Sequence, residues 1–105
     1  MEIKIFDTSL EKFICSLEKQ TIAKVLRSID LLEEFGPVLG MPHTKKISPR
    51  LFELRIRGVQ EIRIFYTFYK SQIWLLHGFI KKSEKTPKKE IRTALQKLKK
   101  LIKQD

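Results

Sequence analysis

The chain has 105 residues, of which 42% are hydrophobic and 32% are charged, and its formal net charge at pH 7 is +10. These values fit one globular domain spanning residues 1–105 and exclude a disordered chain, because enough apolar side chains are present to build a core. No apolar run approaches the roughly 18 residues of a membrane span, and the charged start does not resemble a signal peptide, so we expect a cytoplasmic protein without membrane contact.

The first third of the chain predicts a short strand followed by two helices. Residues 2–6 alternate apolar and polar side chains, which is typical of a strand. Polar residues 7–9 offer N-caps for a helix that begins near Leu10, and its apolar residues recur with helical spacing. A second apolar stripe over residues 22–35 predicts another helix, which the following glycine and proline end. Cys15 is the only cysteine, so no internal disulfide can form.

The middle of the chain predicts a loop and then three strands. Residues 36–50 contain two glycines and three prolines, and we interpret them as an irregular connection. The strands cover residues 51–57, 62–66 and 73–80, with a turn near residues 58–60 and a hairpin near residues 70–71.

Arginines stand among apolar residues in the first two of these strands. Successive strand side chains point to opposite faces, so Glu53, Arg55 and Arg57 share one face and the apolar residues between them share the other. Arg63 lies inside the second strand. A sheet face with several guanidinium groups is suited to holding phosphates.

Thr86 and Pro87 predict the start of a last helix, because threonine is a good N-cap and proline suits the first helical position. The element order is therefore β-α-α-β-β-β-α, an α+β fold with a mainly antiparallel sheet. We expect the two N-terminal helices to cover one face of the sheet and the arginine-bearing face to stay open.

Charge is unevenly distributed along the chain. Residues 1–44 carry five basic and seven acidic side chains, whereas residues 45–105 carry seventeen basic and five acidic ones. Such asymmetry indicates a polyanionic partner, nucleic acid or the ribosome surface. Solubility alone is the alternative, since most individual lysines are simply solvated.

Three motifs, in this order, resemble the RelE/HigB-type toxins of type II toxin–antitoxin systems, in particular the phage-derived Gp49-like branch. They are LFELR at residues 51–55, RIFY at residues 63–66, and LHGFIKK at residues 76–82 followed by Thr86-Pro87. The resemblance implies the small RelE-like fold. It also implies an mRNA endoribonuclease that acts on the ribosome, inhibits translation and is silenced by a cognate antitoxin.

For such a reaction, a ribose 2′-hydroxyl attacks the adjacent phosphodiester, and the resemblance implies roles for several basic residues. Arg63 would stabilise the charge that develops on the phosphate, and Arg55 would share that task. Lys82, with Lys81 as the alternative, would neutralise the phosphate or protonate the leaving group.

Two residues are candidates for the general base. The imidazole of His77 has a suitable ordinary pKa, but strand alternation places it on the face of Leu75, so a core histidine is the alternative. Glu53 is the second candidate, and its alternative role is a salt bridge that orders Arg55 or Arg57.

Other residues are expected to contact RNA. Base stacking is assigned to Tyr66 or Tyr69, and the alternative role of both is structural. Contacts with the RNA backbone are assigned to Lys45, Lys46, Arg50, Arg57, Lys81 and Lys85. The sequence has neither metal-ligand spacing nor a glycine-rich phosphate loop, so we expect no metal and no cofactor.

Two other functions stay open: a toxin of the same fold that poisons DNA gyrase, and a non-catalytic RNA- or ribosome-binding module. The basic set Arg55, Arg63 and Lys82 favours the nuclease, because a protein-binding poison does not need guanidinium groups on a sheet face. The partners expected for the nuclease are mRNA on the ribosome and a cognate antitoxin, which we expect to be a helix-turn-helix protein.

Overall fold

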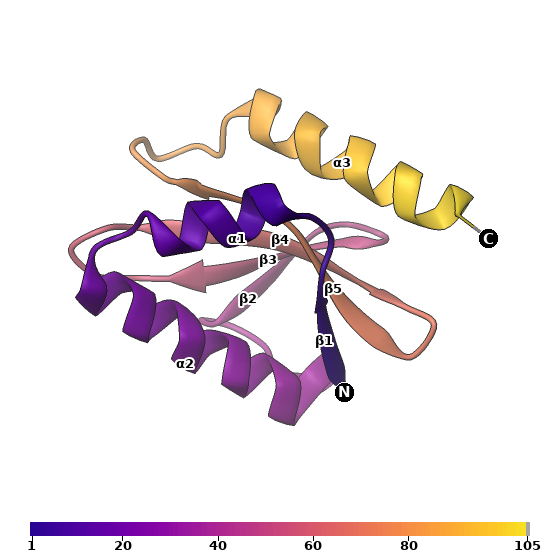
Figure 1. Ribbon diagram of the computed structural model, residues 1–105, viewed down its shortest axis with the longest axis horizontal. Coiled ribbons are helices and arrows are strands. Elements are labelled where there is room, and N and C mark those ends of the chain that lie inside the picture. The colour runs from indigo at the N-terminus through magenta and orange to yellow at the C-terminus, as the bar shows by residue number, and fades with distance from the viewer. Residues whose placement is uncertain (105) are drawn as a thin grey trace.

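The computed structural model describes residues 1–104, which form one strand, two helices, four strands and a last helix (Figure 1). The strands are β1 (Glu2–Ile5), β2 (Thr44–Ser48), β3 (Leu51–Ile56), β4 (Ile62–Tyr69) and β5 (Gln72–Ile80). The helices are α1 (Thr8–Cys15), α2 (Lys19–Phe35) and α3 (Lys88–Lys103), and a short 3-10 helix, η1 (Gly36–Val38), follows α2.

The strands form a single mixed sheet in the order β1-β5-β4-β3-β2. Only β1 pairs in parallel, with β5, while the other neighbours are antiparallel. The expected hairpin between β4 and β5 turns at Lys70 and Ser71, both with positive φ, a geometry that matches the twist of the flanking strands. The α+β class with a mainly antiparallel sheet is confirmed.

Helices cover both faces of the sheet, so the molecule has three layers (Figure 1). The first core lies between the sheet and the pair α1 and α2, and its most buried members include Leu10, Val25, Leu32, Leu54, Ile64 and Leu75. The second core lies between the sheet and α3, and it contains Leu51, Phe65, Leu76, Phe79, Ala94, Leu98 and Leu101.

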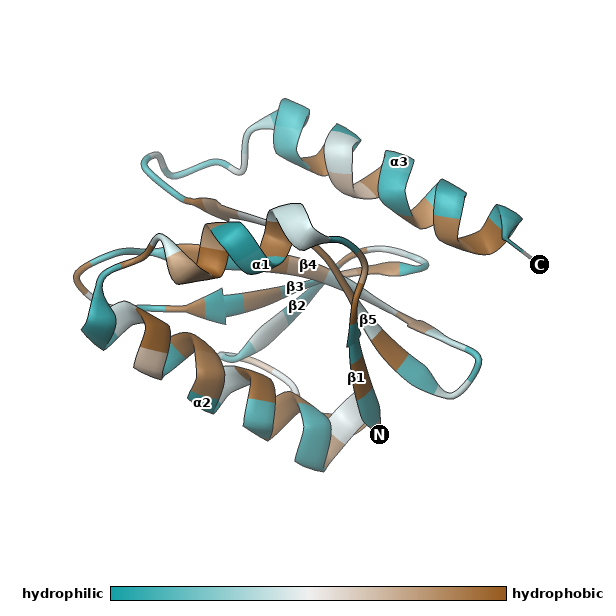
Figure 2. Ribbon diagram, viewed as in Figure 1, coloured by the Kyte–Doolittle hydropathy of each residue, from teal (hydrophilic) through white to brown (hydrophobic). Residues whose placement is uncertain are grey.

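The expectation that the second sheet face stays open is wrong. Helix α3 is amphipathic, and its apolar side turns toward the sheet while its charged side faces outward (Figure 2). Ala94, Leu98 and Leu101 are buried against β4 and β5. An apolar helix stripe needs a surface to pack against, and the α3 side of the sheet supplies it.

The expectation of an irregular connection over residues 36–50 is also only partly right, because residues 44–48 form the edge strand β2. Its sequence, TKKIS, lacks a clear apolar alternation, since an edge strand has one neighbour and needs fewer buried side chains; of its five residues only Thr44 is buried. Lys45 and Lys46 project from it as exposed charges, which protect a free sheet edge from pairing with other chains.

A bulge in β5 changes the face on which His77 lies. The register pairs Phe65 with His77 but the next residue, Tyr66, with Leu75, so Leu76 is an extra residue. Regular alternation would place His77 on the face of Leu75, whereas the bulge turns it toward α3. That expectation is therefore wrong, because one inserted residue inverts the alternation that follows it.

Candidate functional site

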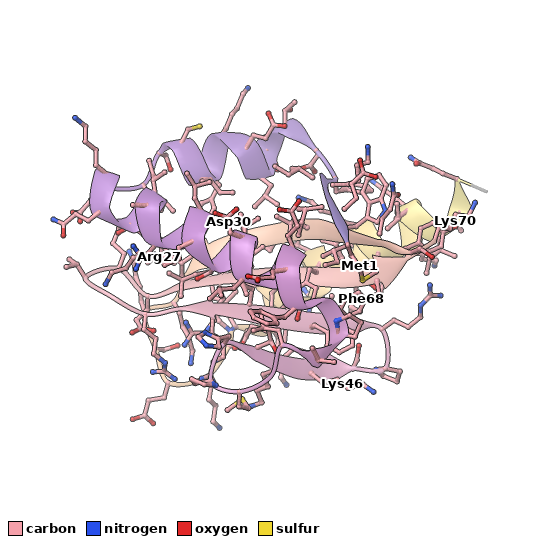
Figure 3. The ribbon with its side chains drawn as sticks, turned by 90° about the horizontal axis from the view of Figure 1, so that it is seen from below. Met1, Arg27, Asp30, Lys46, Phe68 and Lys70 are labelled. Carbon is pink, nitrogen blue, oxygen red and sulfur yellow. The ribbon has the colours of Figure 1, made fainter. Side chains whose placement is uncertain are left out.

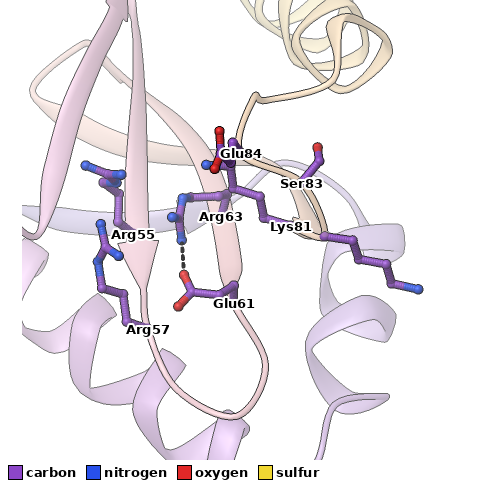
Figure 4. A pocket seen from close by; sticks show the side chains of 8 residues that line it. Arg55, Arg57, Glu61, Arg63, Lys81, Ser83 and Glu84 are labelled. Atoms are coloured by element: carbon purple, nitrogen blue, oxygen red, sulfur yellow. Dashed lines mark hydrogen bonds and ion pairs between the residues drawn. The ribbon is translucent and has the colours of Figure 1, made fainter.

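A pocket of about 530 Å³ opens at the ends of β3 and β5, beside the start of β4 (Figure 4). We call it the arginine pocket, and it is lined by Arg55, Arg57, Glu61, Arg63, Lys81, Lys82, Ser83 and Glu84. Five of these eight side chains are cationic and two are carboxylates, so the lining carries a net positive charge. A pocket of this composition is suited to an anion such as a phosphate group.

Arg63 is the most buried of the pocket residues, with only 2% of its surface exposed. Its Nη1 donates to the Oε2 of Glu61 at 3.2 Å (Figure 4). The same nitrogen donates to the carbonyl oxygen of Ile62 at 3.0 Å. Its Nε is buried and makes no hydrogen bond within the described chain. It lies 3.7 Å from the Oε1 of Glu53, so contacts with two carboxylates and a carbonyl oxygen fix the guanidinium in place.

Arg55 faces Arg63 directly across the β3–β4 pair, and two like charges in that position repel each other. The buried carboxylate of Glu53 offsets this repulsion, since its Oε1 lies 3.8 Å from the Nε of Arg55 and 3.7 Å from the Nε of Arg63. Its Oε2 accepts a hydrogen bond from the Thr86 hydroxyl at 3.2 Å.

These contacts bear on the two roles that the sequence offered for Glu53. The sequence offered a general base or a salt bridge to Arg55 or Arg57, and the structure places the carboxylate between Arg55 and Arg63. Glu53 does not line the arginine pocket. It therefore contacts both arginines from outside the pocket that they line.

Lys81 and Lys82 follow β5, where the strand leaves the sheet, and both line the arginine pocket. The amide of Lys81 donates to the carbonyl oxygen of Glu61 at 2.7 Å. This bond ties the end of β5 to the segment before β4, so cationic and acidic groups from two segments meet around Arg63.

His77 lies apart from the arginine pocket, although the bulge turns it to the same side of the sheet. Its Nε2 is 2.7 Å from the Oε1 of Glu90, on the first turn of α3. Its ring stacks beside those of Phe65 and Phe79, with centroids 6.5 and 6.4 Å away. His77 thus fastens α3 to the sheet, which fits the structural alternative better than the general base.

The remaining candidates for RNA contact are spread over the surface. Lys45 and Lys46 lie on β2, Lys85 lies in the exposed loop before α3, and Arg57 lines the arginine pocket. The guanidinium of Arg50 lies over the ring of Tyr69, 6.0 Å from its centroid. The structure does not gather this set at one site.

The expectation that Tyr66 stacks on an RNA base is wrong. Tyr66 is buried in the first core, and its ring stacks on that of Phe52 with 5.5 Å between the centroids. Burial raises the pKa of its phenol, although a hydrogen bond with Thr44 acts in the other direction. A ring so enclosed cannot stack on a nucleobase, so Tyr66 has the structural role.

Sequence reasoning missed Glu61, Ser83 and Glu84 as residues of the arginine pocket. Glu61 could have been found, because it stands two positions before Arg63 and strand alternation places such residues on one face. Ser83 and Glu84 lie in a loop, where no periodicity indicates the direction of a side chain.

Two general features of the described chain bear on other classes of site. Within residues 1–104, no cluster of three or more His, Cys, Asp and Glu side chains is arranged to hold a metal ion. In the same part of the chain, no helix combines the length and the apolar character needed to cross a membrane.

Comparison with known proteins identifies the family. Residues 12–99 match the family described as phage-derived Gp49-like proteins. Over 75 residues the chain is 37% identical to HigB3 of Mycobacterium tuberculosis, which is provisionally classed as a toxin. The aligned part is 66% of this chain and 65% of HigB3, slightly under two thirds of that relative. Because the family match covers most of the chain, the resemblance to RelE/HigB-type toxins is confirmed, and the chain belongs to the phage-derived Gp49-like family.

Proposed function

We propose that this chain is the toxin of a type II toxin–antitoxin pair: a cytoplasmic, metal-independent endoribonuclease that cuts mRNA on the ribosome. A cognate antitoxin, a helix-turn-helix protein, would neutralise it. Family membership supports the toxin assignment. The observation that carries the chemistry is the position of Arg63, buried and fixed, within a pocket that four further cationic side chains line.

In the proposed reaction, the 2′-oxygen bonds to the adjacent phosphorus and the bond to the 5′-oxygen breaks. The products are a 2′,3′-cyclic phosphate and a 5′-hydroxyl. Arg63 and Arg55 bind the non-bridging oxygens and stabilise the additional negative charge, because a guanidinium stays charged and presents a rigid pair of donors. The ammonium group of Lys82 or Lys81 gives a proton to the leaving 5′-oxygen.

The proton of the 2′-hydroxyl must go to a base inside the pocket. Of the two carboxylates in the lining, Glu61 is the one held against Arg63, at 3.2 Å, and its side chain is 37% exposed. A base beside the phosphate-binding arginine is within reach of the attacking hydroxyl. We therefore assign proton abstraction to Glu61, in place of His77 and Glu53.

Cleavage assays of the wild type and the Arg63→Ala variant test the proposed function. On isolated ribosomes, and after induced expression in bacteria, primer extension should find new 3′ ends within reading frames for the wild type. Removal of Arg63 should lower the cleavage rate by at least about 10²-fold, as expected for the loss of a charge-stabilising group.

Controls separate loss of chemistry from loss of folding. Because Arg63 is buried, Arg57→Ala, an exposed pocket residue, provides a second variant, with Arg92→Ala on the exposed side of α3 as its matched control. Arg57→Ala and Glu61→Gln should slow cleavage, while Arg92→Ala should not. Intact transcripts together with double-strand DNA breaks would contradict the proposal and favour gyrase poisoning.

A further inference from the structure

A second pocket, of about 320 Å³, lies between α2, the segment before β2 and the end of β3. We call it the side pocket, and it is lined by Lys24, Arg27, Ser28, Leu31, Pro42, His43, Arg55, Ile56 and Arg57. Arg27 lies on α2, on the side of the molecule seen in Figure 3.

The side pocket adjoins the arginine pocket, because Arg55 and Arg57 line both. The pairing of the edge strand explains how this is possible. The β2–β3 ladder begins with Thr44 opposite Leu54, so the end of β3 extends beyond β2. Just beyond Leu54, the Arg55 amide donates to the carbonyl oxygen of His43 at 2.8 Å, which joins the segment before β2 to the end of β3, and the exposed Arg57 follows.

The side-pocket lining combines charge with apolar surface. Its four cations are Lys24, Arg27, Arg55 and Arg57, and none of its nine residues is acidic. Leu31, Pro42 and Ile56 supply the apolar part, beside the Ser28 hydroxyl and the His43 imidazole. A simple anion would use only the charges. A nucleotide would use both parts, with its phosphate on the cations and its base against the apolar side chains and the imidazole.

An RNA strand also fits two adjoining pockets. RNA carries a phosphate at every nucleotide, so a strand with one phosphate in the arginine pocket presents the next phosphate nearby. Arg55 and Arg57 stand between the two positions, and Arg27 extends the cationic track onto α2.

We propose that the side pocket binds the nucleotide next to the cleaved phosphodiester, so that the RNA strand bends around the end of β3. This inference rests on the proposed function and adds a binding subsite to it. Arg27 holds the neighbouring phosphate, and His43 with Pro42 lies against the base.

Binding of two RNA probes to the full chain tests this subsite. Both probes are single-stranded and fully 2′-O-methylated, so neither can be cut. The first is a dinucleotide, whose one phosphate fills only the arginine pocket, and the second is a hexanucleotide. The variants are Arg63→Ala, Arg27→Ala and the matched control Arg92→Ala, an exposed helical arginine outside both pockets.

Arg27→Ala should leave dinucleotide binding unchanged, measured by NMR titration, because this probe has no second phosphate. By fluorescence anisotropy, the same variant should bind the hexanucleotide about five- to tenfold more weakly. The slope of the logarithm of its binding constant against the logarithm of the salt concentration should become shallower by roughly 0.7, as expected for one lost phosphate contact. A 4-thiouridine next to the central phosphate should crosslink to the peptide that contains His43.

The outcomes separate the two proposals. If Arg63→Ala leaves dinucleotide binding unchanged, the phosphate site of the proposed function is wrong. If binding depends on Arg63 but Arg27→Ala and Arg92→Ala bind the hexanucleotide equally, the side-pocket inference alone is wrong. Unchanged RNA binding with weaker antitoxin binding by Arg27→Ala would also overturn it, in favour of a protein partner at the side pocket.

Discussion

At the scale of single residues, the site depends on a buried carboxylate between two arginines. Arg55 and Arg63 stand opposite each other across β3 and β4, and Glu53 lies between their Nε atoms. Breaking a buried ion pair leaves an uncompensated charge in a medium where charge is poorly solvated. Glu53 therefore serves both the stability of the fold and the direction of the two guanidinium groups.

Replacing Glu53 with glutamine tests this role. The amide still accepts a hydrogen bond from Thr86 but lacks the charge, so the free energy of unfolding should fall by about 1–3 kcal/mol, measured with urea. Glu61→Gln is the matched control, because the Glu61 carboxylate is 37% exposed. Its unfolding free energy should change by less than about 1 kcal/mol. Equal effects of the two variants would contradict a special role for Glu53.

At the scale of elements, α1 packs onto β5 at a glycine. A Cβ atom built on Gly78 would lie 2.9 Å from the Phe13 Cε2 and 3.1 Å from the Leu10 Cδ1. Both neighbours belong to α1, and Leu10 is almost fully buried. The absence of a side chain at Gly78 therefore allows α1 to approach the strand closely.

Gly78→Ala should lower the free energy of unfolding by about 1–3 kcal/mol, because a methyl group inserted into a packed core displaces α1 or strains side chains. Gly40→Ala is a suitable control, since a Cβ there has nothing within 4 Å. That variant should be unchanged or up to about 1 kcal/mol more stable, because alanine restricts the unfolded chain. Thermal unfolding followed by circular dichroism compares them, and equal stability would refute the close packing.

At the scale of the whole molecule, one polar cluster joins helices that lie on opposite faces of the sheet. Asp7 caps α1 by accepting from the Leu10 amide at 3.2 Å, and its Oδ2 lies 3.0 Å from the Nζ of Lys97 on α3. Partial burial acts to raise the pKa of Asp7, but hydrogen bonds from Lys97, Leu10 and Ser9 outweigh it. The net result is a lowered pKa.

The sign of this shift predicts a pH dependence. A lowered pKa in the folded state means that the carboxylate stabilises the fold above its unfolded pKa, and that this contribution disappears as the pH falls through the folded value. Asp7→Asn keeps an N-cap acceptor but loses the charge, so it should be less stable than the wild type at pH 7, by about 0.5–1 kcal/mol. The difference should vanish in acid.

Urea unfolding at a series of pH values checks this prediction, with Asp30→Asn as the control. Asp30 is an exposed carboxylate on α2 (Figure 3). Its variant should be about as stable as the wild type at pH 7. If the difference in unfolding free energy between the wild type and Asp7→Asn stayed constant from neutral pH to acid, this would contradict the assigned role of the carboxylate.

Much of the fold could be predicted because its signals are local. The apolar stripes of α1 and α2 and the alternation in β3 all lie within a few neighbouring residues. The prediction that Thr86 caps α3 is wrong, because Pro87 is the N-cap and the Thr86 hydroxyl donates to Glu53 instead. Strand β2 could not be predicted in this way, since an exposed edge strand has few apolar side chains to mark it. The bulge at Leu76 could not be predicted either, because it is defined by its pairing with β4.

The sequence by itself determined the α+β class, the family and the basic residues Arg55, Arg63, Lys81 and Lys82, because periodicity, charge and short motifs are written along the chain. Only the tertiary structure decided which of these charges share a pocket, that Glu53 lies between two arginines, and that His77 binds Glu90 on α3. The physical reason is that a site is made of distances between residues remote in sequence, and those distances follow from strand register and helix packing.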